Sequence, residues 1–178
     1  MSETASPPAK AAPILVALGA NLPTEQYGSP QAALEAALEE LSRRGVKAVR
    51  RSRWYESAPV PPSDQPWFVN GVVEVMTHLG PEALLAVLHE TEAAFGRARR
   101  EANAPRTLDL DLIAYGDLVR TESGPPPALP HPRMVGRAFV LLPLAEICPN
   151  WRHPVLGRTA AELAAELPRD QPIRVAQG

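Results

Sequence analysis

Several features that mark large classes of protein are scarce or missing in this chain of 178 residues. No apolar run approaches the roughly 18 residues that a membrane-spanning helix needs, so we expect no membrane span. Cys148 is the one cysteine, which excludes an internal disulfide and fits a reducing compartment, so we expect a cytoplasmic protein. The first ten residues lack the basic and apolar segments of a signal peptide.

Strong charge of one sign is also missing. The net charge of −2 gives no overall attraction to nucleic acid or to an anionic membrane, so neither is expected as a partner. The glycine-rich phosphate loop that ends in Lys-Ser/Thr does not occur, nor do the protein-kinase signatures. No spacing of histidine and cysteine predicts zinc, and no motif predicts a serine or cysteine nucleophile. Any phosphate chemistry would therefore depend on Mg²⁺ and arginines.

Apolar periodicity and turn residues predict alternating strands and helices. Strands are expected at residues 14–18, 46–55, 67–77 and 107–115, and helices between 30 and 45 and between 81 and 96. A hairpin turn at 116–117 is expected to lead into 118–120, and short helices are expected at 137–147 and 159–167.

The order β-α-β-β-α-β indicates an α+β fold with a ferredoxin-like core. Such a core is an antiparallel sheet with helices on one face and room for loops or a ligand on the other, here with C-terminal additions. We expect one domain over residues 14–178, preceded by a disordered extension at 1–13 that is rich in Ala, Pro and Ser. The pattern serves many functions and does not name one.

The segment from Pro105 to Asp111 carries the strongest chemical information. Side chains alternate along a strand, so Asp109 and Asp111 are expected on one face and their leucine neighbours in the core. Two carboxylates about 7 Å apart repel each other unless a cation lies between them. Hard oxygen ligands of this kind suit Mg²⁺. The pattern therefore predicts a magnesium site on a strand face.

Arginines crowd the segment before this strand, between Arg97 and Arg106. Guanidinium groups match phosphate oxygens in geometry, so Mg²⁺ with a polyphosphate is the favoured ligand. A solvated strand face whose carboxylates pair with these arginines is the alternative. The apolar run from Leu112 to Tyr115 favours the functional interpretation, since a buried strand seldom carries two carboxylates without a partner.

Three further positions carry candidate chemistry. Glu92 lies on the apolar stripe of the second predicted helix, where it either reaches water at the edge or is buried against the arginines after Gly96. Phe68 and Asn70 share a strand face and suit either a flat heterocycle or ordinary packing.

His131 precedes a predicted helix start that carries Arg137. Helix starts attract anions, and both side chains add cationic donors, so this segment is a candidate phosphate site. The alternative is a capping histidine beside a surface arginine.

Taken together, these segments resemble the 6-hydroxymethyl-7,8-dihydropterin pyrophosphokinases of folate biosynthesis, from about Ile14 to Asn150. The strongest element, Gly-Pro-Arg-Thr-Leu-Asp-Leu-Asp in the family, is present here with alanine first, from Ala104 to Asp111. Four further elements occur in the family's order along the chain, at Leu18–Leu22, Asp64–Asn70, Glu92–Arg97 and Pro130–Phe139. One such motif is weak, whereas five in order are specific.

The resemblance implies transfer of the pyrophosphoryl group of ATP to the hydroxymethyl oxygen of the pterin, with release of AMP. It implies that Asp109 and Asp111 bind two Mg²⁺ ions, with Asp109 also beside the pterin. Arg97 and Arg106 would contact the phosphates as further catalytic residues. The implied partners are these two small molecules, and we expect a monomer.

The same resemblance assigns the remaining site residues. The pterin would be bound by the backbone of one segment, two aromatic rings and an amide: Ser57, Ala58, Val60, Phe68, Phe139 and Asn70. The nucleotide would be bound by Glu92, Leu112, His131 and Arg137.

Some positions depart from the family pattern. Asn103 stands where many members carry a tryptophan in the catalytic loop, His89 replaces a glutamine, and Ala58 stands where proline is common. Pro126 and Ala128 occupy positions of an arginine and a threonine near ATP in some members, so nucleotide affinity is expected to be lower. None of these positions is an expected metal ligand.

Two other classes of function remain open. The chain could be a non-catalytic nucleotide-binding regulator, which would bind ATP and form no AMP. It could also bind single-stranded RNA through aromatic side chains on the sheet, although the acidic net charge and the two carboxylates oppose this.

Overall fold

The computed structural model describes residues 11–96 and 107–177. Residues 1–10 of the expected N-terminal extension lie outside this part of the chain. Within it, six strands form one antiparallel sheet with the order β5-β1-β4-β3-β6, and β2 also pairs with β4. The strands are β1 (Ile14–Ala20), β2 (Lys47–Arg51), β3 (Tyr55–Ser57), β4 (Phe68–Met76), β5 (Asp109–Tyr115) and β6 (Ile173–Val175).

Four helices accompany this sheet in the described ranges: α1 (Pro30–Arg43), α2 (Pro81–Ala94), α3 (Ala138–Ile147) and α4 (Ala160–Ala165). The predicted α+β class is confirmed, and β1 is an interior strand between β5 and β4. The Ser29 hydroxyl accepts a hydrogen bond from the amide of Ala32 (3.2 Å), and Pro30 occupies the first turn, so α1 begins where the sequence predicts.

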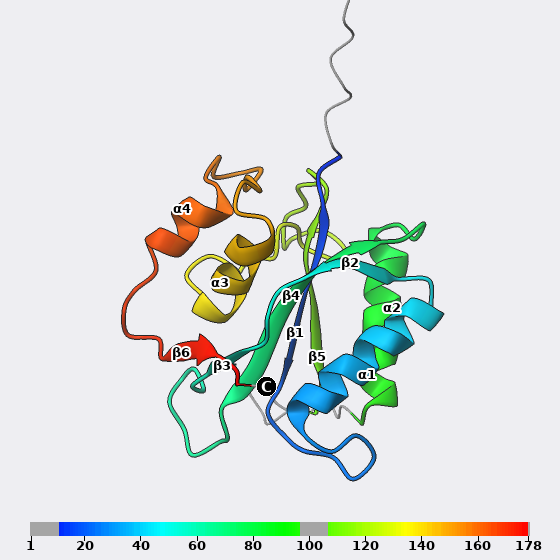
Figure 1. Cartoon of the computed structure of the whole chain (residues 1–178). Coiled ribbons are helices and arrows are strands. Elements are labelled where there is room, and N and C mark those ends of the chain that lie inside the picture. Colours follow the sequence, from blue (N-terminus) through cyan, green and yellow to red (C-terminus); the bar gives the residue numbers. More distant parts are fainter. Residues whose placement is uncertain (1–10, 97–106, 178) are drawn as a thin grey trace, which may run out of the picture.

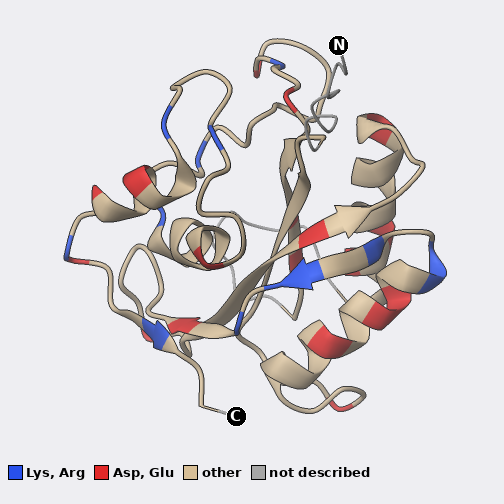
Figure 2. Cartoon of the chain, turned by 45° about the horizontal axis from the view of Figure 1, so that its top comes forward, with Lys and Arg blue, Asp and Glu red and all other residues tan. Residues whose placement is uncertain are grey.

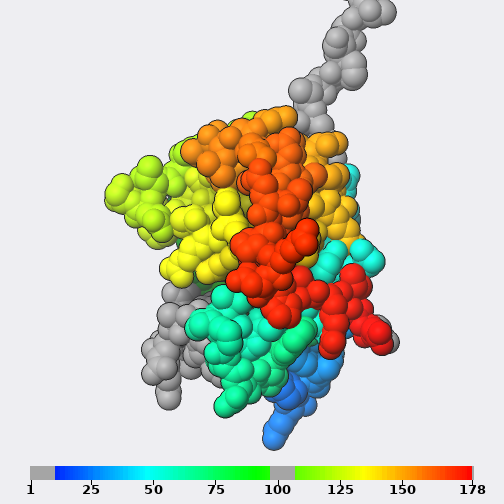
Figure 3. Space-filling model, turned by 90° about the vertical axis from the view of Figure 1, so that its left-hand side faces the viewer, coloured from blue at the N-terminus to red at the C-terminus, as the bar shows by residue number. Residues whose placement is uncertain are grey.

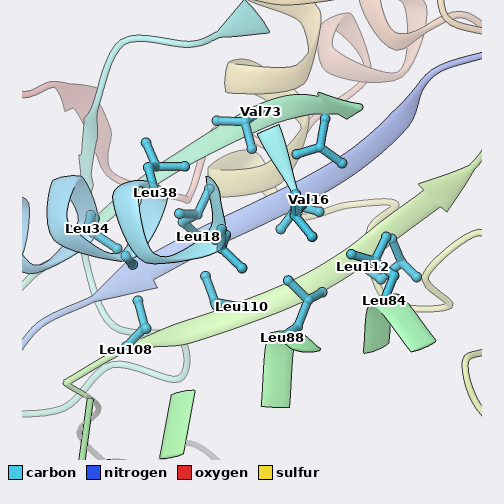
Figure 4. Packing of buried hydrophobic residues seen from close by; sticks show 14 of the residues in the cluster. Val16, Leu18, Leu34, Leu38, Val73, Leu84, Leu88, Leu108, Leu110 and Leu112 are labelled. Atoms are coloured by element: carbon cyan, nitrogen blue, oxygen red, sulfur yellow. The ribbon is translucent and has the colours of Figure 1, made fainter. Parts of the chain in front are cut away.

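A first core lies between one sheet face and the pair α1 and α2 (Figure 1). Val16 and Leu18 of β1 meet Leu34 of α1 and Leu88 of α2, as Figure 4 shows. The leucines at 108, 110 and 112 point into this core, as the alternation predicts. The two carboxylates of β5 therefore face the other side of the sheet.

A second core lies on that other side, where α3 and α4 pack (Figure 1). Leu15 of β1, Val72 of β4 and Ile113 of β5 meet Leu141 and Leu144 of α3. The expected C-terminal additions thus cover part of the sheet face that the sequence predicted to carry only loops or a ligand. The physical reason is that α3 is apolar nearly all round, so it needs to be buried.

The predicted strand at 46–55 is divided into β2 and β3. Between them the Ser52 hydroxyl accepts a hydrogen bond from the amide of Val72 (3.0 Å). The register against β4 shifts by one residue over this segment, since Arg51 pairs with Val73 and Tyr55 with Asn70. The Arg51 guanidinium lies 2.7 Å from the Glu35 carboxylate of α1. Figure 2 shows this pattern of basic residues on β2 beside acidic residues on α1.

Two other expectations change. The turn at 116–117 forms, but the predicted return strand does not: Arg120 exchanges two backbone hydrogen bonds with Leu129 instead of pairing with β5. The strand β6 was not predicted, and it pairs with the edge of β3. In the part of the chain that the structure describes, no helix has both the length and the apolar character to cross a membrane.

Candidate active site

The sheet register brings residues from four strands into one row. Asp109 of β5 pairs with Gly19 of β1, Gly19 pairs with Asn70 of β4, and Asn70 pairs with Tyr55 of β3. Directly paired residues point to the same face of a sheet. Asp109 and Asn70 therefore share a face across a glycine, and Asp111 follows in the next row on that face, opposite Ala17.

Both carboxylates are half-buried on the face that carries the second core. Among the described residues, no group of three or more His, Cys, Asp or Glu side chains forms a complete metal cage. Mg²⁺ usually keeps several waters and takes one or two protein carboxylates together with phosphate oxygens of its substrate. A pair such as Asp109 and Asp111 fits this donor set, with the substrate completing it.

Asn70 is held in one orientation. Its side chain is only 5% exposed, and its amide nitrogen donates to the hydroxyl of Ser57 (2.7 Å). The amide oxygen lies over Gly19, since a Cβ placed on Gly19 would be 2.8 Å from it. The glycine thus makes the space that this amide occupies beside Asp109. Asn70 is suited to recognise a polar edge of a flat ring.

The two predicted aromatic rings come from different elements on the same side of the sheet. Phe68 begins β4, opposite Ser57, and shares the face of Asn70 by alternation. Phe139 lies in the first turn of α3, packs against the second core and is half-buried. The Arg137 guanidinium lies 5.4 Å from the centre of the Phe139 ring, in cation–π geometry.

His131 is fixed beside β5. Its backbone amide donates to the carbonyl of Ile113 (2.8 Å), and its Nδ1 accepts from the amide of Arg133 (3.2 Å). Burial lowers the pKa of His131, and the positive charges of Arg137 and Arg133 lower it further, while Asp109 opposes them. His131 Nδ1 thus closes a turn and does not cap α3, whose N-cap position is held by Arg137. The same ring lies within the electrostatic field of Asp109 and Arg137.

Glu92 is buried, with 2% of its surface exposed, so the alternative that it reaches water is wrong. One carboxylate oxygen accepts a hydrogen bond from the amide of Leu110 (3.3 Å) at the outer edge of β5. The side chain of Leu112 lies in the first core, on the face away from Asp109. A nucleotide contact from Leu112 would therefore use its backbone.

The segment predicted to bind the pterin through its backbone is partly engaged within the protein. The amide of Ala58 donates to the carbonyl of Pro172 (3.1 Å). A ligand contact from the backbone of Ala58 would therefore use the Ala58 carbonyl. Ser57 is buried and pairs with Phe68, whereas Val60 is 58% exposed in the loop that follows. Ser57 and Ala58 thus lie beside the site row, while Val60 lies in the surface loop.

Comparison with known proteins decides the family. Residues 15–149 match the family model described as 7,8-dihydro-6-hydroxymethylpterin-pyrophosphokinase (HPPK). A 2-amino-4-hydroxy-6-hydroxymethyldihydropteridine pyrophosphokinase of Pseudomonas aeruginosa is 45% identical over 161 residues, which is 87% of this chain and 91% of that protein. The enzyme of the same name from Synechocystis is 43% identical over 75% of this chain and 68% of that protein. The chain belongs to this pyrophosphokinase family.

Solved structures agree at the level of fold. A Plasmodium falciparum HPPK-DHPS crystal structure with pteroate has a TM-score of 0.68 at 15% identity, covering 88% of this chain and 44% of that chain. The chain likewise spans 19% of the folic acid synthesis protein fol1 of Pneumocystis carinii, with 38% identity. This pyrophosphokinase-family chain therefore corresponds to one part of these longer proteins.

Two predicted catalytic residues of this family member, Arg97 and Arg106, lie outside the described residues, as does Asn103. Their assignment stays a prediction from the sequence.

One buried residue of the site was missed as a functional position. Asn21 follows β1 and donates from its amide nitrogen to the side chain of Gln65 and to the carbonyl of Pro66, both at 3.1 Å. It thereby ties the loop before Phe68 to the end of β1. The sequence offered a signal, because Asn21 and Gln65 both lie in segments that resemble the family, but their contact links residues 44 positions apart.

Proposed function

We propose that this chain transfers the pyrophosphoryl group of ATP to 6-hydroxymethyl-7,8-dihydropterin, yielding AMP and the pterin diphosphate of folate biosynthesis. Family membership supports the reaction class. The single structural observation that carries the proposal is the row in which Asp109, Gly19 and Asn70 face the same side of the sheet. The row supports the proposal because a metal-bound phosphate at Asp109, with Asp111 in the next row, would lie one glycine away from an amide suited to a heterocycle.

Asp109 and Asp111 would hold Mg²⁺ at the phosphates of ATP. When bound, Mg²⁺ neutralises charge that develops on the transferring group. The proposed reaction then depends mainly on positioning, because phosphoryl transfer asks the protein for alignment and charge neutralisation rather than for covalent chemistry. In this proposal two Mg²⁺ ions act, both held through these carboxylates.

The remaining residues of the chain orient the two substrates. Asn70, locked by Ser57 and seated over Gly19, fixes the in-plane orientation of the pterin. The rings of Phe68 and Phe139 hold its faces and exclude water from the acceptor oxygen. This arrangement favours attack by the pterin hydroxyl over wasteful attack by water.

His131 and Arg137 bind the nucleotide phosphates in this proposal. The lowered pKa of His131 keeps the ring neutral near pH 7 in the free protein, so Nε2 is a neutral hydrogen-bonding group until phosphate approaches. Arg137 stays charged and supplies the fixed cation. Negative phosphate charge would raise the pKa of His131 and strengthen the contact when ATP binds.

The proposal is tested by mixing the chain with Mg²⁺, ATP and the pterin and separating the nucleotides by chromatography. AMP formed in step with pterin diphosphate is the expected result. Asp109→Asn and Asp111→Asn should each abolish turnover with the fold unchanged by circular dichroism, whereas Asp117→Asn, in the exposed turn after β5, is a control that should retain it. ADP in place of AMP, or full activity in both β5 variants, would refute the proposal.

We also propose that the chain acts as a cytoplasmic monomer. The single cysteine supports a reducing compartment. Sedimentation equilibrium in the presence of ATP and pterin tests the oligomeric state, and a mass near twice 19.2 kDa would refute the monomer.

A further inference from the structure

The segment from Gln171 to Ile173 contacts two walls of the site. The Gln171 side chain accepts a hydrogen bond from the amide of Ala138 (3.0 Å) and donates to the carbonyl of Gly136 (2.7 Å). The carbonyl of Pro172 accepts from the amide of Ala58 (3.1 Å), and Ile173 pairs with Ser57. Three consecutive residues thus connect the start of α3 to β3.

Figure 3 shows this arrangement from the outside. The red C-terminal segment lies against the yellow segment that leads into α3 and against the teal segment that follows β3. Arg174 secures it, since its guanidinium lies 2.7 Å from the Glu56 carboxylate and 5.0 Å from the centre of the Trp67 ring. Trp67 directly precedes the predicted pterin-stacking ring of Phe68.

The position of the Gln171 contacts is specific. Arg137 holds the N-cap position of α3, and Gly136 and Ala138 are its neighbours in the chain. The two hydrogen bonds of the Gln171 side chain therefore lie on either side of Arg137. The amide of Ala138 is the first of α3, and a helix leaves its first amides without partners in its own backbone. Gln171 therefore acts as a cap supplied from 33 residues away.

We infer that Gln171 is a positioning residue for the pterin and nucleotide sites, an inference that rests on the proposed function. Through Gly136 and Ala138 it sets the backbone of Arg137 and, two residues after Arg137, the ring of Phe139. Through the adjoining Pro172 it fixes the distance between that ring and the opposite wall at Ala58. Residues 150–177 lie beyond the part of the chain that matches the family model, so the family match does not supply this role.

The test compares Gln171→Ala with Thr159→Ala in the full chain. Thr159 caps α4 through the amide of Glu162 (3.1 Å), so its removal deletes a similar helix cap away from the site row. We expect Gln171→Ala to lower kcat/KM for the pterin about tenfold, because small misplacements of binding groups slow a positioned reaction. Thr159→Ala should keep the parent kcat/KM, although both variants lower the unfolding midpoint.

Gln171→Glu separates the two hydrogen bonds. Its carboxylate still accepts from Ala138 but no longer donates to Gly136, so kcat/KM should lie between those of the parent and Gln171→Ala. Parent kinetics in Gln171→Ala, or an equal loss in Thr159→Ala, would overturn the inference and leave the proposed function standing.

A parent chain that forms no AMP would instead overturn the proposed function. Hydrogen exchange of the Ala138 amide then tests the contact without turnover. Faster exchange in Gln171→Ala is expected, and unchanged exchange would overturn the positioning role by showing that the side chain does not hold the start of α3.

Discussion

Replacing Gly19 by alanine would separate the function of the site from the stability of the fold. Gly19 lies in β1 between Asp109 and Asn70, and its backbone is one that alanine adopts. The added Cβ would lie 2.8 Å from the Asn70 amide oxygen, so that side chain must move. Since Asn70 is tied to Ser57 at 2.7 Å, movement weakens that hydrogen bond as well.

The expected magnitudes differ for folding and for binding. A Gly→Ala change in a compatible conformation stabilises by about 0.4–1 kcal/mol through the unfolded chain. A weakened hydrogen bond between Asn70 and Ser57 costs about 1 kcal/mol, so the two effects nearly cancel. If Asn70 binds the pterin as proposed, one or two further hydrogen bonds would be lost in the complex, which corresponds to roughly tenfold to hundredfold weaker binding.

Isothermal titration with the pterin in the presence of a non-hydrolysable ATP analogue measures this loss, and urea unfolding measures stability. Gly71→Ala is a matched control, because Gly71 pairs with Leu18 in the adjacent row and faces the opposite side. A Cβ there would lie 2.6 Å from the Trp54 ring, so stability should fall by about 1–3 kcal/mol with little change in pterin affinity. Unchanged pterin affinity in Gly19→Ala would refute the assigned role of Asn70.

Three other changes give separate expectations. Phe139→Ala should weaken pterin binding about tenfold and ATP binding less, since it removes one of the two rings proposed to stack on the pterin; equal losses in calorimetry would count against stacking. Glu92→Ala should reduce the free energy of unfolding by about 2–4 kcal/mol, because it leaves the buried amide of Leu110 without its carboxylate; urea titration checks this, with exposed Glu90→Ala as the control. Burial lowers the pKa of His153, so below about pH 6.5 the unfolded chain binds more protons than the folded chain, and stability decreases as the pH is lowered. In His153→Gln the urea midpoint should therefore change less between about pH 7 and about pH 5. An unchanged pH profile would contradict this assignment.

The sequence predicted those parts of the fold that are determined locally. The alternation around Asp109 placed its leucine neighbours in the first core, and helix-start residues placed α1 and α2 correctly. The break at Ser52 could not be predicted from the strand pattern, because it accompanies a change of register against β4, a strand distant in the sequence. Strand β6 could not be predicted either, because it has only three residues and is a strand only through its pairing with β3.

In the candidate site, too, the sequence predicted what depends on local alternation and not what depends on packing between distant segments. The two carboxylates of β5 and the shared face of Phe68 and Asn70 followed from side-chain alternation alone. The burial of Glu92 was undecided in the sequence, because an apolar stripe does not reveal what packs at its edge. Helix α3 covering part of the carboxylate face also needed the structure, and it argues against an RNA-binding surface, which needs an open sheet.

The outer edge of β5 has a consequence for association between copies of the chain. An edge strand with open backbone groups invites another strand to pair with it, and this is a common route to aggregation. Here the Glu92 carboxylate accepts a hydrogen bond from the amide of Leu110, and the amide of His131 donates one to the carbonyl of Ile113. Residues predicted to bind the nucleotide therefore also shield the strand that carries Asp109 and Asp111. Variants that remove them should be judged for solubility as well as for turnover.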